Sequence, residues 1–176
     1  MPRACLVILT ILLPAGCDRH KPRAPALSDE PVYSSSRDGL SFLAPVGWTQ
    51  WSKSDAPPEA SEKDRVLVSY RSPPDAASEF DVSRADLPDS ADLAERLALP
   101  SHNSGSAWQP AGKPEAAKVG DQDATRFTFA CKELVKESTV VRHGGHVYFF
   151  TVVSPKADEA SRRQIRALVA EARWTN

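Results

Sequence analysis

The sequence lacks an excess of charge of either sign, because 22 Lys and Arg residues nearly balance 23 Asp and Glu residues for a net charge of −1. Holding a nucleic-acid backbone or an anionic bilayer by charge requires a basic excess, so electrostatics indicates no nucleic-acid partner. The sequence is also poor in glycine, with 8 residues against 15 prolines. With 41% hydrophobic and 26% charged residues, this is the composition of one globular domain joined to extended segments.

The motifs that mark common catalytic sites are missing as well. The sequence contains no G-x-S-x-G, S-x-x-K, H-E-x-x-H or C-x-x-C pattern and no calcium loop. Asp121 and Asp123 would share a face of an extended segment and could pair for acid-base work or a cation, although a solvated strand entry is the favoured interpretation. We therefore expect no enzymatic activity, no catalytic residues and no cofactor, and hydrolysis is the function that the residues support least.

The N-terminus has the pattern of an export signal. Arg3 precedes an apolar run, Leu6–Leu13, that is far shorter than the roughly 20 residues of a membrane-spanning helix. Pro14-Ala15-Gly16-Cys17 follows and resembles a bacterial lipobox, with Pro14 where leucine is usual. The resemblance implies cleavage after residue 16 and lipidation of Cys17; ordinary cleavage that leaves a free Cys17 thiol is the alternative. We expect an exported protein on the periplasmic face of the inner or outer membrane, or on the cell surface.

Cysteine usage fits an exported domain without disulfides. Cys5 leaves with the signal peptide and Cys17 carries lipid, so Cys131 is the one cysteine left in the folded part. Cys131 has no general base nearby in the sequence, and we expect a buried small hydrophobic residue rather than a nucleophile.

Residues 17–37 read as a tether and 38–176 as the domain. The tether carries spaced prolines at positions 22, 25 and 31 and three consecutive serines, and cannot form a core. Spaced prolines favour an extended chain that holds a domain away from a bilayer. The Pro22-Arg-Ala-Pro25 spacing also fits a polyproline ligand, but a spacer is the simpler interpretation.

Short apolar and β-branched runs predict strands in the domain. They fall on either side of the Pro45–Gly47 turn and at 65–71, 79–85, 123–131, 134–142 and 146–154. Trp48 and Trp51 fall on opposite faces of the second run. The last two runs form a hairpin, because Gly144-Gly145 supplies the positive φ of a two-residue turn. The segment 101–118 reads as a long polar loop.

Two helices are expected. The first covers 91–99 after the N-cap candidates Asp89 and Ser90, and the second covers 156–173, with Ser154 as N-cap and Pro155 as first helical residue. The second helix places an apolar stripe on one face, formed by Ile165, Leu168, Val169 and Ala172. Together these elements predict an α+β fold, an antiparallel sheet of about six strands with helices packed on it.

The order of these elements resembles the PsbP-like superfamily. The resemblance rests on a Gly-Leu-Ser-Phe strand, a Pro-x-Gly-Trp turn, and a strand with Gly120, Asp121, Ala124 and Phe127, followed by the hairpin and a terminal helix. It implies an α/β/α sandwich in a superfamily that includes an extrinsic subunit of photosystem II and bacterial lipoproteins. Its members are mostly non-catalytic, and no site is carried over.

One pair of residues suggests metal chemistry. A two-residue turn places His143 and His146 opposite each other, and two imidazoles can bind Zn²⁺ or Cu²⁺. His20 and His102 lie in the tether and the long loop, so further ligands are missing from the pattern. We expect a membrane-anchored, non-catalytic envelope lipoprotein that binds or supports another envelope protein, with metal or small-ligand binding through His143 and His146 as the alternative.

Overall fold

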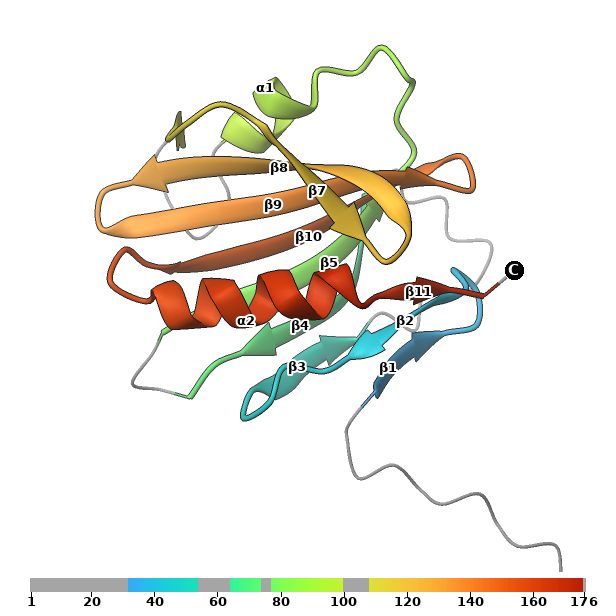
Figure 1. Cartoon of the computed structure of the whole chain (residues 1–176), viewed down its shortest axis with the longest axis horizontal. Coiled ribbons are helices and arrows are strands. Elements are labelled where there is room, and N and C mark those ends of the chain that lie inside the picture. The colour runs from blue at the N-terminus through green and yellow to red at the C-terminus, as the bar shows by residue number, and fades with distance from the viewer. Residues whose placement is uncertain (1–31, 54–63, 74–76, 100–107, 176) are drawn as a thin grey trace, which may run out of the picture.

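The computed structural model describes residues 32–53, 64–73, 77–99 and 108–175, which form two antiparallel sheets and two helices (Figure 1). The larger sheet has the order β3-β4-β5-β10-β9-β8-β6, with β7 also paired to β8, and the smaller sheet has the order β1-β2-β11. The predicted signal peptide, Cys17 and the first part of the predicted tether lie outside the described residues.

The elements have the following bounds. The strands are β1 (Val32–Ser35), β2 (Leu40–Leu43), β3 (Thr49–Lys53), β4 (Asp64–Arg71), β5 (Glu79–Ala85), β6 (Gln109–Pro110), β7 (Glu115–Val119), β8 (Gln122–Cys131), β9 (Leu134–His143), β10 (His146–Pro155) and β11 (Arg173–Trp174); the helices are α1 (Leu93–Ala98) and α2 (Glu159–Ala170).

One face of the large sheet is covered by α2 and the small sheet, which lie on the same side in Figure 1. The alternation of the strands turns Phe80, Val82, Tyr148 and Phe150 to this side, where they meet Phe42 of β2. The predicted apolar stripe completes this core, because Ile165, Leu168 and Val169 of α2 are buried and so is Ala172. Ala172 lies just beyond the helix, however, because α2 ends at Ala170 and not at residue 173 as expected.

The other face carries a second, smaller core. Leu97 of α1 packs there with Phe149, Val147 and Phe129, and Trp108 is 2% exposed among them. The chain therefore places layers on both faces of one antiparallel sheet, which confirms the predicted sandwich of helices on a sheet, in a form with more strands than expected.

One buried ion-pair cluster and one partly buried ion pair fasten the outer layers to the large sheet. Asp38, whose side chain is fully buried, accepts from Arg84 at 2.8 Å and from Arg65 at 3.1 Å, which joins the turn after β1 to β4 and β5. Arg166 of α2 binds Glu137 of β9 through two hydrogen bonds of 2.7 and 2.8 Å. Breaking such a buried pair by removing one partner is costly, because the other charge stays buried without compensation.

Several sequence expectations are wrong at the N-terminal side and in the number of strands. The sheets have eight and three strands, not about six in one sheet. Residues 32–37 belong to the fold rather than to the tether, since β1 pairs with β2 and buries Tyr33. The segment 101–118 is not wholly a loop: its described part holds β6 and β7, both paired with β8.

The helix starts also differ from the expectation. Asp92, not Asp89 or Ser90, caps α1, and its carboxylate accepts from the backbone N–H groups of Ala94 and Glu95. Pro155 is not a first helical residue: β10 extends through it, and Asp158 caps α2 through the N–H of Ser161. Pairing with β9 keeps the chain extended for longer than the local Ser-Pro signal indicates.

Candidate binding groove

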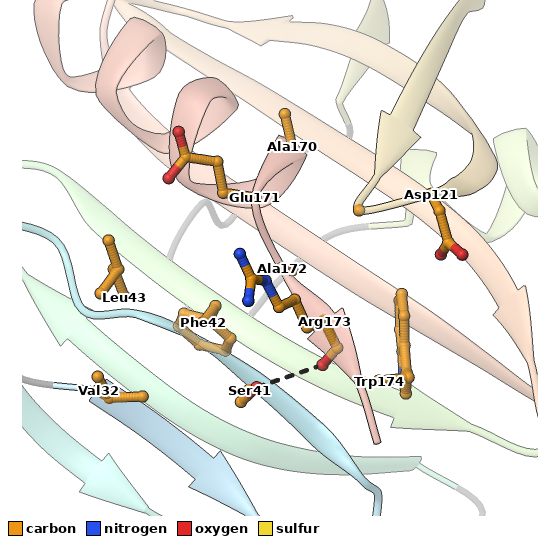
Figure 2. Close-up of a pocket in the computed structure, with 11 residues that line it drawn as sticks. Val32, Ser41, Phe42, Leu43, Asp121, Ala170, Glu171, Ala172, Arg173 and Trp174 are labelled. Carbon is orange, nitrogen blue, oxygen red and sulfur yellow. Dashed lines mark hydrogen bonds between the residues drawn. The ribbon is translucent and has the colours of Figure 1, made fainter. Parts of the chain in front are cut away.

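A groove of about 720 Å³ opens where the small sheet meets the end of α2 (Figure 2). Val32 and Leu43, paired in register on β1 and β2, form one wall, and Asp121 in the β7–β8 turn lies on the other side. The segment 170–174, which leaves α2 and becomes β11, runs between them. The groove has the size of a typical ligand site, and its lining comes from three distant parts of the sequence.

Two glycine turns hold this connecting segment in place. Gly120 (φ +59°) lies so close to the carbonyl oxygen of Ala172 that a Cβ atom would collide with it. Gly39 (φ +61°) accepts from the N–H of Thr175 at 2.7 Å, and a Cβ there would lie 2.5 Å from the carbonyl oxygen of Thr175. Both positions thus need glycine for its conformation and for the close backbone approach.

The charges along the groove are mostly negative. Glu171 is the C-cap residue of α2, a helix with no basic residue in its last turn, and is exposed beside the carbonyl groups of the helix end. Those carbonyls carry the negative end of the helix dipole, so a carboxylate there adds to the negative potential. Asp121 adds a second carboxylate, and Arg173 is the one basic residue of the lining.

The aromatic end of the groove is Trp174. Its indole stacks on His143 with ring centroids 4.5 Å apart and meets Tyr148 edge-on at 5.7 Å. The Nε1 atom of Trp174 is buried and has no hydrogen-bond partner. Such an unpaired buried donor costs stability, so packing of the ring must hold this side chain in place.

The structure places the predicted histidine pair directly opposite each other on β9 and β10, across the Gly144-Gly145 turn. Their rings contact different partners, however: His143 stacks on Trp174, whereas His146 Nδ1 lies 2.5 Å from an Asp86 carboxylate oxygen. Within the described ranges, no three His, Cys, Asp or Glu side chains lie close enough to hold a metal ion. Metal binding by this pair stays a prediction.

The other sequence candidates are separated from one another. Asp121 lines the groove, whereas Asp123 is exposed and forms an ion pair with Lys118 at 2.6 Å. Cys131 is a free, buried thiol at the end of β8, which confirms the expected burial. In the part of the chain that the structure describes, neither helix is long and apolar enough to cross a membrane.

Sequence reasoning missed Lys136, whose side chain is buried under α1. Its ammonium group donates to the carbonyl oxygen of Leu97 and lies 4.8 and 5.3 Å from the ring centroids of Trp108 and Phe129. Burial lowers the pKa of Lys136 to about 8. A lysine in a strand gives no sequence signal for this environment, because the covering residues come from α1, from Trp108 just before β6 and from Phe129 of β8.

Solved structures of other proteins share this arrangement, in which layers cover both faces of one antiparallel sheet. No family model matches the sequence, and no curated protein sequence matches it. The solution structure of cyanobacterial PsbP (CyanoP) from Synechocystis sp. PCC 6803 matches with a TM-score of 0.58 and 17% identity over 87% of this chain and 98% of that chain. The chain therefore has a PsbP-like fold.

Two further structures are similar. A crystal structure from Bacteroides thetaiotaomicron has a TM-score of 0.51 and 14% identity over 85% of this chain, and this chain spans 50% of that one. LpqN of Mycobacterium tuberculosis, described as involved in cell envelope biogenesis, has 12% identity over 86% of this chain and 88% of that chain; its TM-score of 0.44 is too low to support a comparison of sites. The TM-scores above 0.5, those of the Synechocystis and Bacteroides structures, show a shared fold, and at 17% and 14% identity they show the fold alone.

Proposed function

We propose that the protein is a lipid-anchored, non-catalytic envelope module that binds another envelope protein through the groove. The groove itself is the observation that carries the proposal. It combines an apolar wall, Val32 and Leu43, that is partly exposed at 52% and 39%, with charged groups on the other side. An apolar surface rimmed by charge is typical of sites where proteins bind one another.

The position of the groove on the chain supports an envelope partner. Val32 lines the groove and is the first described residue, so the segment that leads back to Cys17 joins the domain at the groove wall. If that segment is extended, the 14 residues between Cys17 and Val32 let the chain span about 45 Å from Cys17 to Val32. A lipid on Cys17 would then keep the groove within reach of proteins at the same membrane.

Site-specific crosslinking tests this function. A benzophenone attached to Leu43→Cys in the full-length lipoprotein, mixed with detergent-solubilised native membranes and irradiated, should give one reproducible adduct. Trp51→Cys is the matched control, because Trp51 is exposed on β3 and does not line the groove. The same adducts from both positions, or none from Leu43→Cys, would contradict the proposal.

A further inference from the structure

We propose that the occupant of the groove is an extended peptide segment that pairs with the free edge of β2 and places a basic side chain near Asp121 and Glu171. This inference rests on the proposed function and specifies the chemistry of the partner. It follows from the open edge of the small sheet, from the charges beside that edge and from the apolar wall opposite them.

The small sheet is incomplete on one side of β2. β1 pairs with all four residues of β2, from Leu40 to Leu43. On the other side β11 pairs with two of them only, through Arg173 with Ser41 and Trp174 with Leu40. In the described structure no strand continues this pairing along Phe42 and Leu43, because the chain before β11 turns into α2.

The unpaired half of this edge borders the groove. Phe42 and Leu43 both line it, and Figure 2 shows β2 running along its wall with the end of α2 opposite. A strand edge with free backbone groups is a template for an added strand. A peptide that lies there would continue a sheet in which β11 has already formed the first two pairs.

The charges favour a basic residue in this peptide. Asp121 and Glu171 both lie in exposed positions of the lining, and the helix end adds its negative potential next to Glu171. Arg173 offsets one of the two carboxylates, which leaves the groove with a net negative charge. Electrostatic complementarity of this kind selects the partner and its register.

The apolar wall of the groove requires an apolar side chain in the bound peptide. Val32 and Leu43 are cross-strand partners, so their side chains stand together on one face of the small sheet. A bound strand that continues past β11 would place alternate side chains on that face, and an apolar one would cover this pair. The expected peptide therefore alternates an apolar with a basic side chain over three to five residues.

Selection from a random heptapeptide phage library on the detergent-solubilised full-length protein tests the inference. The wild-type groove should enrich peptides that combine Lys or Arg with β-branched or aromatic residues. Asp121→Lys combined with Glu171→Lys should weaken a selected peptide about tenfold, which corresponds to about 1.4 kcal/mol. Glu133→Lys is the matched control, because its exposed carboxylate lies in the β8–β9 turn and not in the groove.

Backbone N-methylation separates strand addition from other ways of binding. Two versions of a synthetic selected peptide carry methyl groups on the amides of its odd-numbered or of its even-numbered residues. One version should lose binding and the other should keep its affinity within about twofold, since only alternate N–H groups face the partner strand. Equal affinity of the two methylated peptides overturns the inference, and so does an affinity that Asp121→Lys combined with Glu171→Lys leaves unchanged. If no peptide is enriched while the Leu43→Cys adduct still forms, a partner bound in another form remains and the strand-like occupant is refuted.

Discussion

Replacing Lys136 by methionine should remove a pH dependence of stability that the wild-type protein carries above pH 7. The lysine side chain is 6% exposed at the residue level, and its ammonium contacts the Leu97 carbonyl oxygen and two aromatic rings without an acidic partner among the described residues. Those contacts do not replace the hydration that the charge loses on burial, so the charged form is disfavoured in the fold.

The size of the effect follows from the pKa of Lys136, which falls from 10.5 to about 8. A difference of 2.5 pK units corresponds to about 3 kcal/mol between the two protonation states. Between these two values the unfolded chain binds the proton that the folded protein has released, so folding stability rises with pH through this window. Integration over the two titrations gives an increase of about 2 kcal/mol between pH 7 and pH 9.5.

Urea unfolding followed by tryptophan fluorescence measures this effect, with Cys17→Ala in both proteins to remove the predicted lipidation site. The free energy of unfolding of the wild type minus that of Lys136→Met should increase by about 2 kcal/mol from pH 7 to pH 9.5. Tyr33, Tyr70 and Tyr148 have pKa values raised by burial and lower the stability above pH 10, but they occur in both proteins and cancel. If the difference in unfolding free energy between the two proteins stays constant within about 0.5 kcal/mol from pH 7 to pH 9.5, the reasoning is refuted. A constant difference means that Lys136 releases no proton on folding in this range.

Three further predictions follow from the contacts described above. Gly120→Ala should lower the free energy of unfolding by about 2 kcal/mol or more, since a Cβ would collide with the Ala172 carbonyl; wild-type stability in urea would contradict this. Asp38→Ala should cost about 3–5 kcal/mol because it leaves two buried guanidinium groups without their carboxylate, and a melting temperature equal to that of wild type would contradict this. The alternative function through His143 and His146, which lie opposite each other on β9 and β10, predicts that Zn²⁺ raises the melting temperature and that His143→Ala removes the rise; equal melting with and without Zn²⁺ would end this alternative.

The parts of the fold that local chemistry specifies could be predicted from the sequence. Gly144-Gly145 is flanked by alternating apolar residues, and the hairpin forms in the expected register with His143 opposite His146. The stripe on α2 likewise faces the core. In both cases the signal and the structure it determines lie within a few residues of each other.

The rest depends on distant residues. β1 is a strand because β2 pairs with it and Asp38 lies against Arg65 and Arg84, and none of this is visible in a serine-rich stretch. β6 and β7 require β8 as a neighbour. The groove could not be located from the sequence for the same reason, because its walls come from β1 and β2, the β7–β8 turn and the end of α2.

The small sheet is completed by the last strand of the chain, β11, so β2 lacks one neighbour during most of protein synthesis. Ser41 and the Arg173 carbonyl it contacts are 132 positions apart, and β2 gains its second neighbour only after α2 has been made. Pairing over such a separation is slow, because the entropy of closing the intervening loop must be overcome first. While a nascent chain emerges with its N-terminus first, the β1–β2 hairpin therefore presents an unprotected edge to chaperones and to other nascent chains until β11 pairs with it.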